Sequence, residues 1–109
     1  MASDLTGTSG PFHTVQIGLS ATPGNVVRVD LPPWARKFTV IFKTSANADD
    51  AGRVSGAGTD GAAIGVNCFP VPSGQALSCD IASLSSTRSV YITGDTASGN
   101  AHVILEAGL

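Results

Sequence analysis

The stretch that decides the fold is Lys37-Phe38-Thr39-Val40-Ile41-Phe42-Lys43-Thr44. Its apolar residues alternate, so Phe38, Val40 and Phe42 point to one face of an extended chain. The opposite face carries lysine and threonine together with Ile41. This alternation predicts a strand with one buried and one solvated face, which is typical of antiparallel sheets.

The same period of two recurs on both sides of this stretch, interrupted by glycine, proline and asparagine. We expect about eight short strands, at Phe12–Leu19, Val26–Leu31, Lys37–Thr44, Arg53–Ala57, Ala62–Phe69, Gln75–Ile81, Arg88–Thr93 and Ala101–Glu106. They predict an all-β fold, a single-domain antiparallel β-sandwich or jelly roll, that takes residues 12–109. An immunoglobulin-like sandwich stays open, although Trp34 precedes both cysteines. Residues 1–11 are expected to be a flexible N-terminal segment.

Charge is scarce along the whole chain. Only 13% of the 109 residues are charged, against about 25% in an ordinary soluble domain. Glu106 is the only glutamate, and Lys37 and Lys43 are the only lysines, which argues against a helical bundle. The net charge of −2 and the lack of a basic cluster argue against a nucleic-acid partner. The N-terminus has no signal-peptide pattern and no apolar run could span a bilayer, so we expect synthesis in a cytoplasm and no membrane partner.

Two features are candidates for recognition. The segment Ser45–Ala63 has few large apolar residues and is expected to be mostly a long exposed loop, which often carries function. Its charged residues form a candidate partner-binding set: Asp49, Asp50, Arg53 and Asp60. Turn chemistry explains these aspartates better than a calcium loop does, because the EF-hand register and closing glutamate are absent. Trp34 is either an exposed aromatic platform or, by the alternative that we favour, a plug at one end of the sandwich.

Catalytic and metal chemistry find little support in the residue pattern. His13 and His102 lie on the first and last expected strands and could be neighbours, but no third ligand has a defined spacing. Cys68 and Cys79 are expected to be free, mostly buried thiols, with a disulfide across a hairpin as the alternative. No serine sits in a nucleophile elbow and neither cysteine has a nearby histidine. We therefore predict no enzyme activity, no metal site and no cofactor.

Charged residues are scarce at the outward-facing strand positions, which hold serine, threonine, alanine and a few aliphatic residues such as Ile41 and Ile104. A free monomer usually covers such positions with charge of both signs. Small uncharged side chains leave few charges to desolvate when two protein surfaces meet. The pattern therefore favours a protein that works packed against its own copies or against a larger lattice.

Three stretches carry a family resemblance: Leu31-Pro32-Pro33-Trp34-Ala35-Arg36-Lys37-Phe38-Thr39-Val40-Ile41-Phe42, Gly58-Thr59-Asp60-Gly61-Ala62-Ala63-Ile64-Gly65 and Tyr91-Ile92-Thr93-Gly94-Asp95-Thr96-Ala97-Ser98-Gly99-Asn100-Ala101-His102-Val103. In these, the chain resembles small virion proteins of tailed bacteriophages, the jelly-roll-like capsid decoration (cement) and head- or tail-fibre attachment proteins. The resemblance implies a structural virion protein that forms a homo-oligomer, expected to be a trimer. It also implies binding to the major capsid protein or another virion protein. The alternative is a small binding module that recognises a glycan or a protein surface through residues 45–63.

Overall fold

The computed structural model describes residues 2–81 and 88–107 of the chain. Within them it contains nine strands, and none of these residues is helical. The strands are β1 (Ser3–Asp4), β2 (Phe12–Gly18), β3 (Val27–Leu31), β4 (Lys37–Lys43), β5 (Gly52–Ser55), β6 (Phe69–Val71), β7 (Ala76–Asp80), β8 (Arg88–Gly94) and β9 (Asn100–Glu106).

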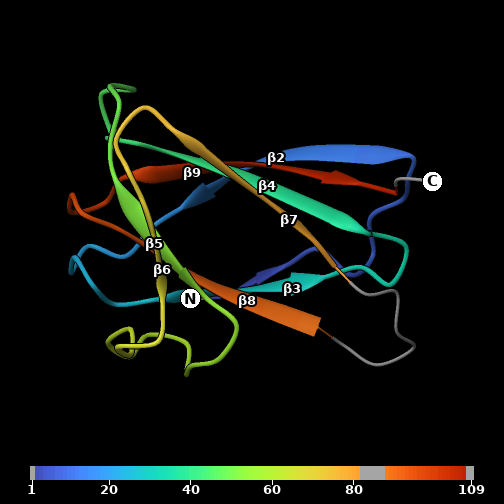
Figure 1. Ribbon diagram of the computed structural model, residues 1–109, viewed down its shortest axis with the longest axis horizontal. Helices are drawn as coiled ribbons and strands as arrows, with labels where there is room; N and C mark the ends of the chain where they lie inside the picture. Colours follow the sequence, from blue (N-terminus) through green and yellow to red (C-terminus); the bar gives the residue numbers. More distant parts are fainter. Residues whose placement is uncertain (1, 82–87, 108–109) are drawn as a thin grey trace.

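The strands form two sheets that pack face to face (Figure 1). One sheet has the order β2-β9-β4-β7, and the other has the order β1-β3-β8-β5-β6. From β2 to β9 the pairs β2·β9, β3·β8, β4·β7 and β5·β6 are antiparallel and nested inside one another. Such nesting is that of one long hairpin rolled into two layers, the jelly-roll arrangement. The predicted all-β sandwich is confirmed.

The core lies between the two sheets, where the predicted alternation places the apolar side chains. Phe38, Val40 and Phe42 of β4 are fully buried, and Val103 and Leu105 of β9 face the same interior. Val27, Val29 and Leu31 of β3 and Ile92 of β8 cover them from the other sheet. A Cβ on Gly52 would lie 2.5 Å from the ring of Phe42, so β5 approaches the core at a position without a side chain.

The expected strand at Ala62–Phe69 is wrong. The strand in this region is β6, which begins at Phe69 and contains Pro70. Proline cannot donate to a sheet ladder, but β6 is an edge strand and has a partner on one side only. Burial of Val71 against the core holds this short strand in place.

The N-terminal segment, expected to be flexible and outside the domain, packs against the sandwich between residues 3 and 8. β1 pairs in parallel with β3, and the side chain of Leu5 is buried. The Leu5 N–H donates to the carbonyl oxygen of Asp30 at 2.9 Å. The segment joins the domain because β3 would otherwise be an open edge and because Leu5 supplies apolar surface to cover the core.

Candidate functional site

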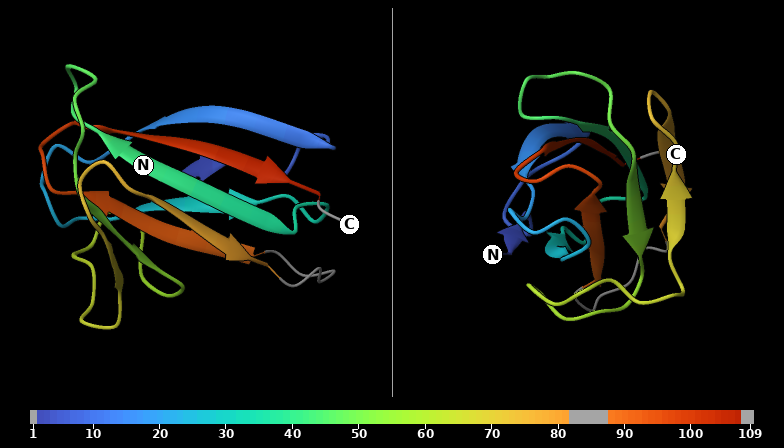
Figure 2. Two further views of the ribbon diagram at one scale, coloured as in Figure 1. Left: turned by 45° about the horizontal axis from the view of Figure 1, so that its top comes forward. Right: turned by 90° about the vertical axis from the view of Figure 1, so that its left-hand side faces the viewer.

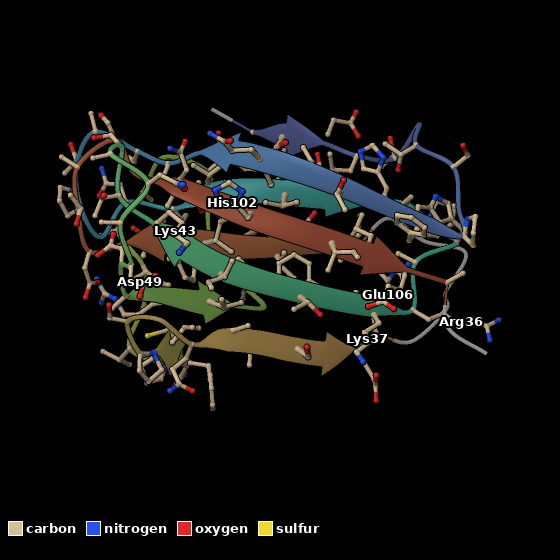
Figure 3. All side chains as sticks on the ribbon, turned by 90° about the horizontal axis from the view of Figure 1, so that it is seen from above. Arg36, Lys37, Lys43, Asp49, His102 and Glu106 are labelled. Carbon is tan, nitrogen blue, oxygen red and sulfur yellow. The ribbon has the colours of Figure 1, made fainter. Side chains whose placement is uncertain are left out.

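The outward residues of the β2-β9-β4-β7 sheet lie in rows across its four strands (Figure 3). The two middle rows are Gln16, His102, Ile41 and Ala76, and Thr14, Ile104, Thr39 and Ser78. We call these eight residues the neutral face, because none of them is an acid, a lysine or an arginine. Ile41 and Ile104 are half-buried, and the Thr39 and Ser78 hydroxyl groups share a hydrogen bond of 2.8 Å. The face is thus partly apolar and carries no formal charge when His102 is neutral.

The neutral face is hollowed. A shallow depression of about 410 Å³ is lined by side chains of β2, β4, β7 and β9, among them Thr14, Gln16, Thr39, Ile41, Ala76, His102 and Ile104. No phenylalanine, tyrosine or tryptophan belongs to this lining. Sugar-binding hollows commonly use such rings as stacking platforms, so the residue types here fit a protein surface better than a sugar.

Charged residues stand at both ends of the neutral face (Figure 3). One end row consists of Phe12, Glu106, Lys37 and Asp80, so that its charges alternate in sign across three neighbouring strands. At the other end, Lys43 Nζ lies 2.7 Å from Asp49 Oδ1 in an ion pair. The charges therefore frame the neutral face and do not enter it.

The candidate partner-binding residues at 49–60 do not form one exposed loop. Arg53 lies in β5, which is flanked by β8 and β6, and so divides the segment that was expected to be mostly loop. Asp49 forms the ion pair with Lys43, and Asp60 Oδ1 accepts the backbone N–H of Arg28 at 2.9 Å. Asp50 is buried. These contacts explain Asp49 and Asp60 as parts of the fold. The strand expected at Arg53–Ala57 is present at Gly52–Ser55.

Asp50 is unusual among the described residues because its Oδ2 atom is buried without a hydrogen-bond partner. The side chain is 8% exposed and lies beside Gly94 and Gly99. A Cβ on Gly99 would lie 2.8 Å from the carbonyl oxygen of Lys43, 3.5 Å from that of Thr96 and 3.7 Å from Asp50 Oδ2. Several oxygen acceptors therefore lie close together around Gly99, and the absence of a side chain at this glycine leaves space for them.

Trp34 is not an exposed aromatic platform. Its ring is partly buried against the core, and its Nε1–H donates to the carbonyl oxygen of Thr8 at 2.6 Å. A Cβ on Gly10 would lie 3.2 Å from the ring, so the N-terminal segment covers it. The structure thus favours the alternative of a plug, because the segment that precedes β2 folds over the indole.

A second uncharged surface lies on the connection between β5 and β6, at residues that we had not predicted as a site. Val66 is 97% exposed and Phe69 is 59% exposed. We call residues 64–69 the apolar tip; the connection that carries it projects away from the core below β6 (Figures 1 and 2). The signal was present in the sequence, because the chain carries no charged residue between Asp60 and Asp80.

The base of the apolar tip is anchored by backbone hydrogen bonds to the segment that precedes β3. Val26 N–H donates to Ala62 O at 2.9 Å, and Gly61 N–H donates to Val26 O at 2.9 Å. Ile64 N–H donates to Gly24 O at 2.8 Å. Val66 therefore projects from a fixed backbone, which lowers the entropy that ordering it in a contact would cost.

The histidines are not neighbours, although their strands pair. His13 is opposite Leu105 and His102 is opposite Gln16, so the histidines are three positions apart in register. An odd number of positions places their side chains on opposite faces of the sheet. Within residues 2–81 and 88–107, no three side chains of histidine, cysteine, aspartate or glutamate gather where they could hold a metal ion.

The cysteines are free thiols, and both are half-buried rather than mostly buried. Cys79 lies on the inward face of β7 and packs against the core. Burial raises the pKa of the Cys79 thiol, and the neighbouring Asp80 carboxylate raises it further. A raised pKa leaves little thiolate at neutral pH, which is the opposite of what a nucleophilic cysteine needs.

A search for helices in the described residues found none that is long and apolar enough to cross a membrane. No protein-family model matches this chain. Comparisons with curated proteins and with solved structures likewise found no match.

Proposed function

We propose that this chain is a structural component of a tailed-phage virion, a capsid-decoration or fibre-attachment protein that works as a multimer. The observation that carries the proposal is that one small domain presents two separate uncharged surfaces, the neutral face and the apolar tip. A component that joins its own copies and also attaches to a particle needs two contact surfaces. An enzyme or a small-ligand module needs one enclosed pocket, whereas the hollow on the neutral face is shallow.

The two surfaces lie on different sides of the molecule. The neutral face belongs to the β2-β9-β4-β7 sheet, and the apolar tip extends from the β5 and β6 strands of the other sheet (Figure 1). One partner can therefore occupy each surface without excluding the other. We assign the neutral face to contacts between copies and the apolar tip to the capsid.

The jelly-roll architecture is compatible with this role but does not select it, since capsid domains and lectins share it. The second candidate, a binding module for a glycan or protein, relied on the 45–63 loop and on Trp34. Asp49 and Asp60 of that loop are bonded within the fold, and the indole is covered by the N-terminal segment. No observation in the described residues favours that candidate over the first.

The test of the proposed function is particle association. In a density gradient of the lysate in which the chain is produced, the wild-type chain is expected to sediment with virus particles. Val66→Asp with Phe69→Asp is expected to reduce this association at least about tenfold, because burying each of these side chains is worth roughly 1.5–3 kcal/mol. Both residues are exposed, so the double variant keeps its fold.

The matched control is Ala97→Asp, which adds a carboxylate at an exposed position in the turn between β8 and β9. This variant is expected to associate with particles as the wild type does. A chain that never sediments with particles would overturn the proposal. If that chain also bound a glycan array, the binding module would replace it.

A further inference from the structure

The two central residues of the end row of the β2-β9-β4-β7 sheet carry opposite charges. Across the row lie Phe12, Glu106, Lys37 and Asp80, in the order of the strands. Glu106 and Lys37 occupy the two central strands, on either side of the midline of the sheet. When a second copy of the row is laid over the first with its strand order reversed, Lys37 of each copy therefore lies over Glu106 of the other.

We propose that two copies of this chain pair face to face through the neutral face, about a two-fold axis that runs along the strands between β9 and β4. This deepens the proposed function, because it names the geometry of one of its two contacts. The two-fold rotation lays β4 of one copy over β9 of the other. Each row of residues then lies over the same row of the other copy, with the strand order reversed. Lys37 of each copy then faces Glu106 of the other, which forms two ion pairs between the copies.

The middle of such a contact is free of charged side chains. Ile41 lies over His102 of the other copy, and Ile104 lies over Thr39. Burying these two middle rows removes apolar surface from water, and neither row holds an acid, a lysine or an arginine that would be left unpaired. In the end row, Asp80 of each copy lies over Phe12 of the other, on the outermost strands. Stacked sheets cross at about 30°, an angle that the long side chains of Lys37 and Glu106 can follow at the end of the contact.

The other face-to-face arrangement, about a two-fold axis across the strands, is disfavoured by charge. It lays β4 of one copy over β4 of the other in the reverse direction, so that the two end rows of one copy meet the opposite end rows of its partner. Lys37 of each copy then faces Lys43 of the other. Like charges at close range oppose association. The same patch meeting itself is a two-fold contact in either case, so this surface supports a dimer and not the trimer that the resemblance implies.

The size of the face sets the expected strength. Three strands of seven residues and one of five, spaced about 4.8 Å apart and rising about 3.4 Å per residue, cover roughly 430 Å² in plan. Specific interfaces of standard size bury about 800 Å² for each partner, so this contact is smaller than that and belongs with the weak, transient interfaces. The dimer is therefore expected to depend on concentration and to weaken with salt, which screens the ion pairs at its exposed end.

The experiment is sedimentation equilibrium of single-charge variants. The wild-type chain is expected to dimerise in the range of about 1–100 µM. Lys37→Glu and Glu106→Lys each place like charges opposite one another, and each is expected to weaken the dimer at least about tenfold. Under the disfavoured axis, Lys37→Glu would face Lys43 and strengthen the dimer. The sign of this change therefore decides between the two arrangements.

Mixing the two single variants is the decisive step. In the mixed pair, the glutamate at position 37 faces the lysine at position 106, and Lys37 of the other variant faces Glu106. Two chains that are each monomeric alone are therefore expected to form a heterodimer when mixed. This rescue also shows that both variants are folded.

The matched control is Arg36→Glu, which makes the same change of charge at an exposed position just outside β4 (Figure 3). Its dimerisation is expected to equal that of the wild type. A chain that stays monomeric at about 100 µM, a trimer, or single variants that do not form a heterodimer would each overturn the pairing. A monomeric chain that still sediments with virus particles would overturn the pairing and leave the proposed function standing.

Discussion

Gly52→Ala tests whether the core is as closely packed as the structure shows. A Cβ at position 52 would lie 2.5 Å from Cγ and Cδ2 of Phe42 and 2.6 Å from Cδ1. The ring of Phe42 is fully buried and β5 is held between β8 and β6, so neither side can move freely. The backbone of Gly52 is not in the left-handed region, so alanine meets a steric clash and no backbone strain. Overpacking of this kind costs about 1–3 kcal/mol.

The assay is urea unfolding of the wild type and of Gly52→Ala at equal protein concentration. The variant is expected to lose about 1–3 kcal/mol of unfolding free energy. Each kcal/mol corresponds to a fall of roughly 4–8 °C in Tm for a domain of about this size. The matched control is Gly18→Ala, in a strand position where no atom lies within 4 Å of the added Cβ. It is expected to be neutral or to stabilise by up to about 1 kcal/mol, because alanine restricts the unfolded chain.

A double-mutant cycle with Phe42→Leu assigns the cost to the ring. Leucine is smaller, so Gly52→Ala is expected to destabilise the Phe42→Leu background by at least about 1 kcal/mol less than it destabilises the wild type. The reasoning would be refuted if Gly52→Ala changed the unfolding free energy by less than about 0.5 kcal/mol, or if the two substitutions were additive.

Three further predictions concern polar groups inside the fold. Asp50→Asn turns an amide N–H toward the oxygen atoms around the orphaned Oδ2 and is expected to stabilise the fold by about 0.5–1.5 kcal/mol in urea unfolding. The control, Asp95→Asn at an exposed position, should change stability by less than about 0.5 kcal/mol, and a large loss in Asp50→Asn would contradict the reasoning. Trp34→Phe removes the Nε1–H donor to Thr8 and is expected to lower the unfolding free energy by about 1 kcal/mol or more, and an unchanged Tm would argue against that hydrogen bond. The pKa of Cys79 is raised in the folded state, so its contribution to stability is complete below the thiol's unfolded pKa, about 8.5, and is lost as the pH rises through the folded value. Between about pH 7 and 10, the unfolding free energy should therefore fall more steeply in the wild type than in Cys79→Val. Parallel curves for the two proteins would count against this prediction.

The sequence predicts some features of the two candidate surfaces, and other features depend on the tertiary structure. Alternation in the sequence predicts that the middle outward positions of β4 and β9 are uncharged and that lysine and glutamate lie at the strand ends, since neighbouring residues of a strand point to opposite faces. That Ile41 and His102 lie side by side in one row depends on the pairing of two strands some 60 residues apart. The apolar tip was visible as an uncharged stretch, but its exposure depends on which residues of the stretch the core takes, and it takes Val71 and leaves Val66.

The sequence by itself determined the class of fold and the inward face of the strands that were correctly placed. Phe38, Val40 and Phe42 were expected on one face, and they are fully buried there. The physical reason is that the period of two is a local property, which every strand repeats without reference to its partners.

The tertiary structure decided everything that depends on partners distant in the chain. Pro70 lies in a strand because β6 is an edge, and Asp50 is buried because the turn between β8 and β9 packs beside it. His13 and His102 lie on opposite faces because the register of β2 and β9 separates them by an odd number of positions. Register is set by the combined packing of all strands, so no single stretch of sequence contains it.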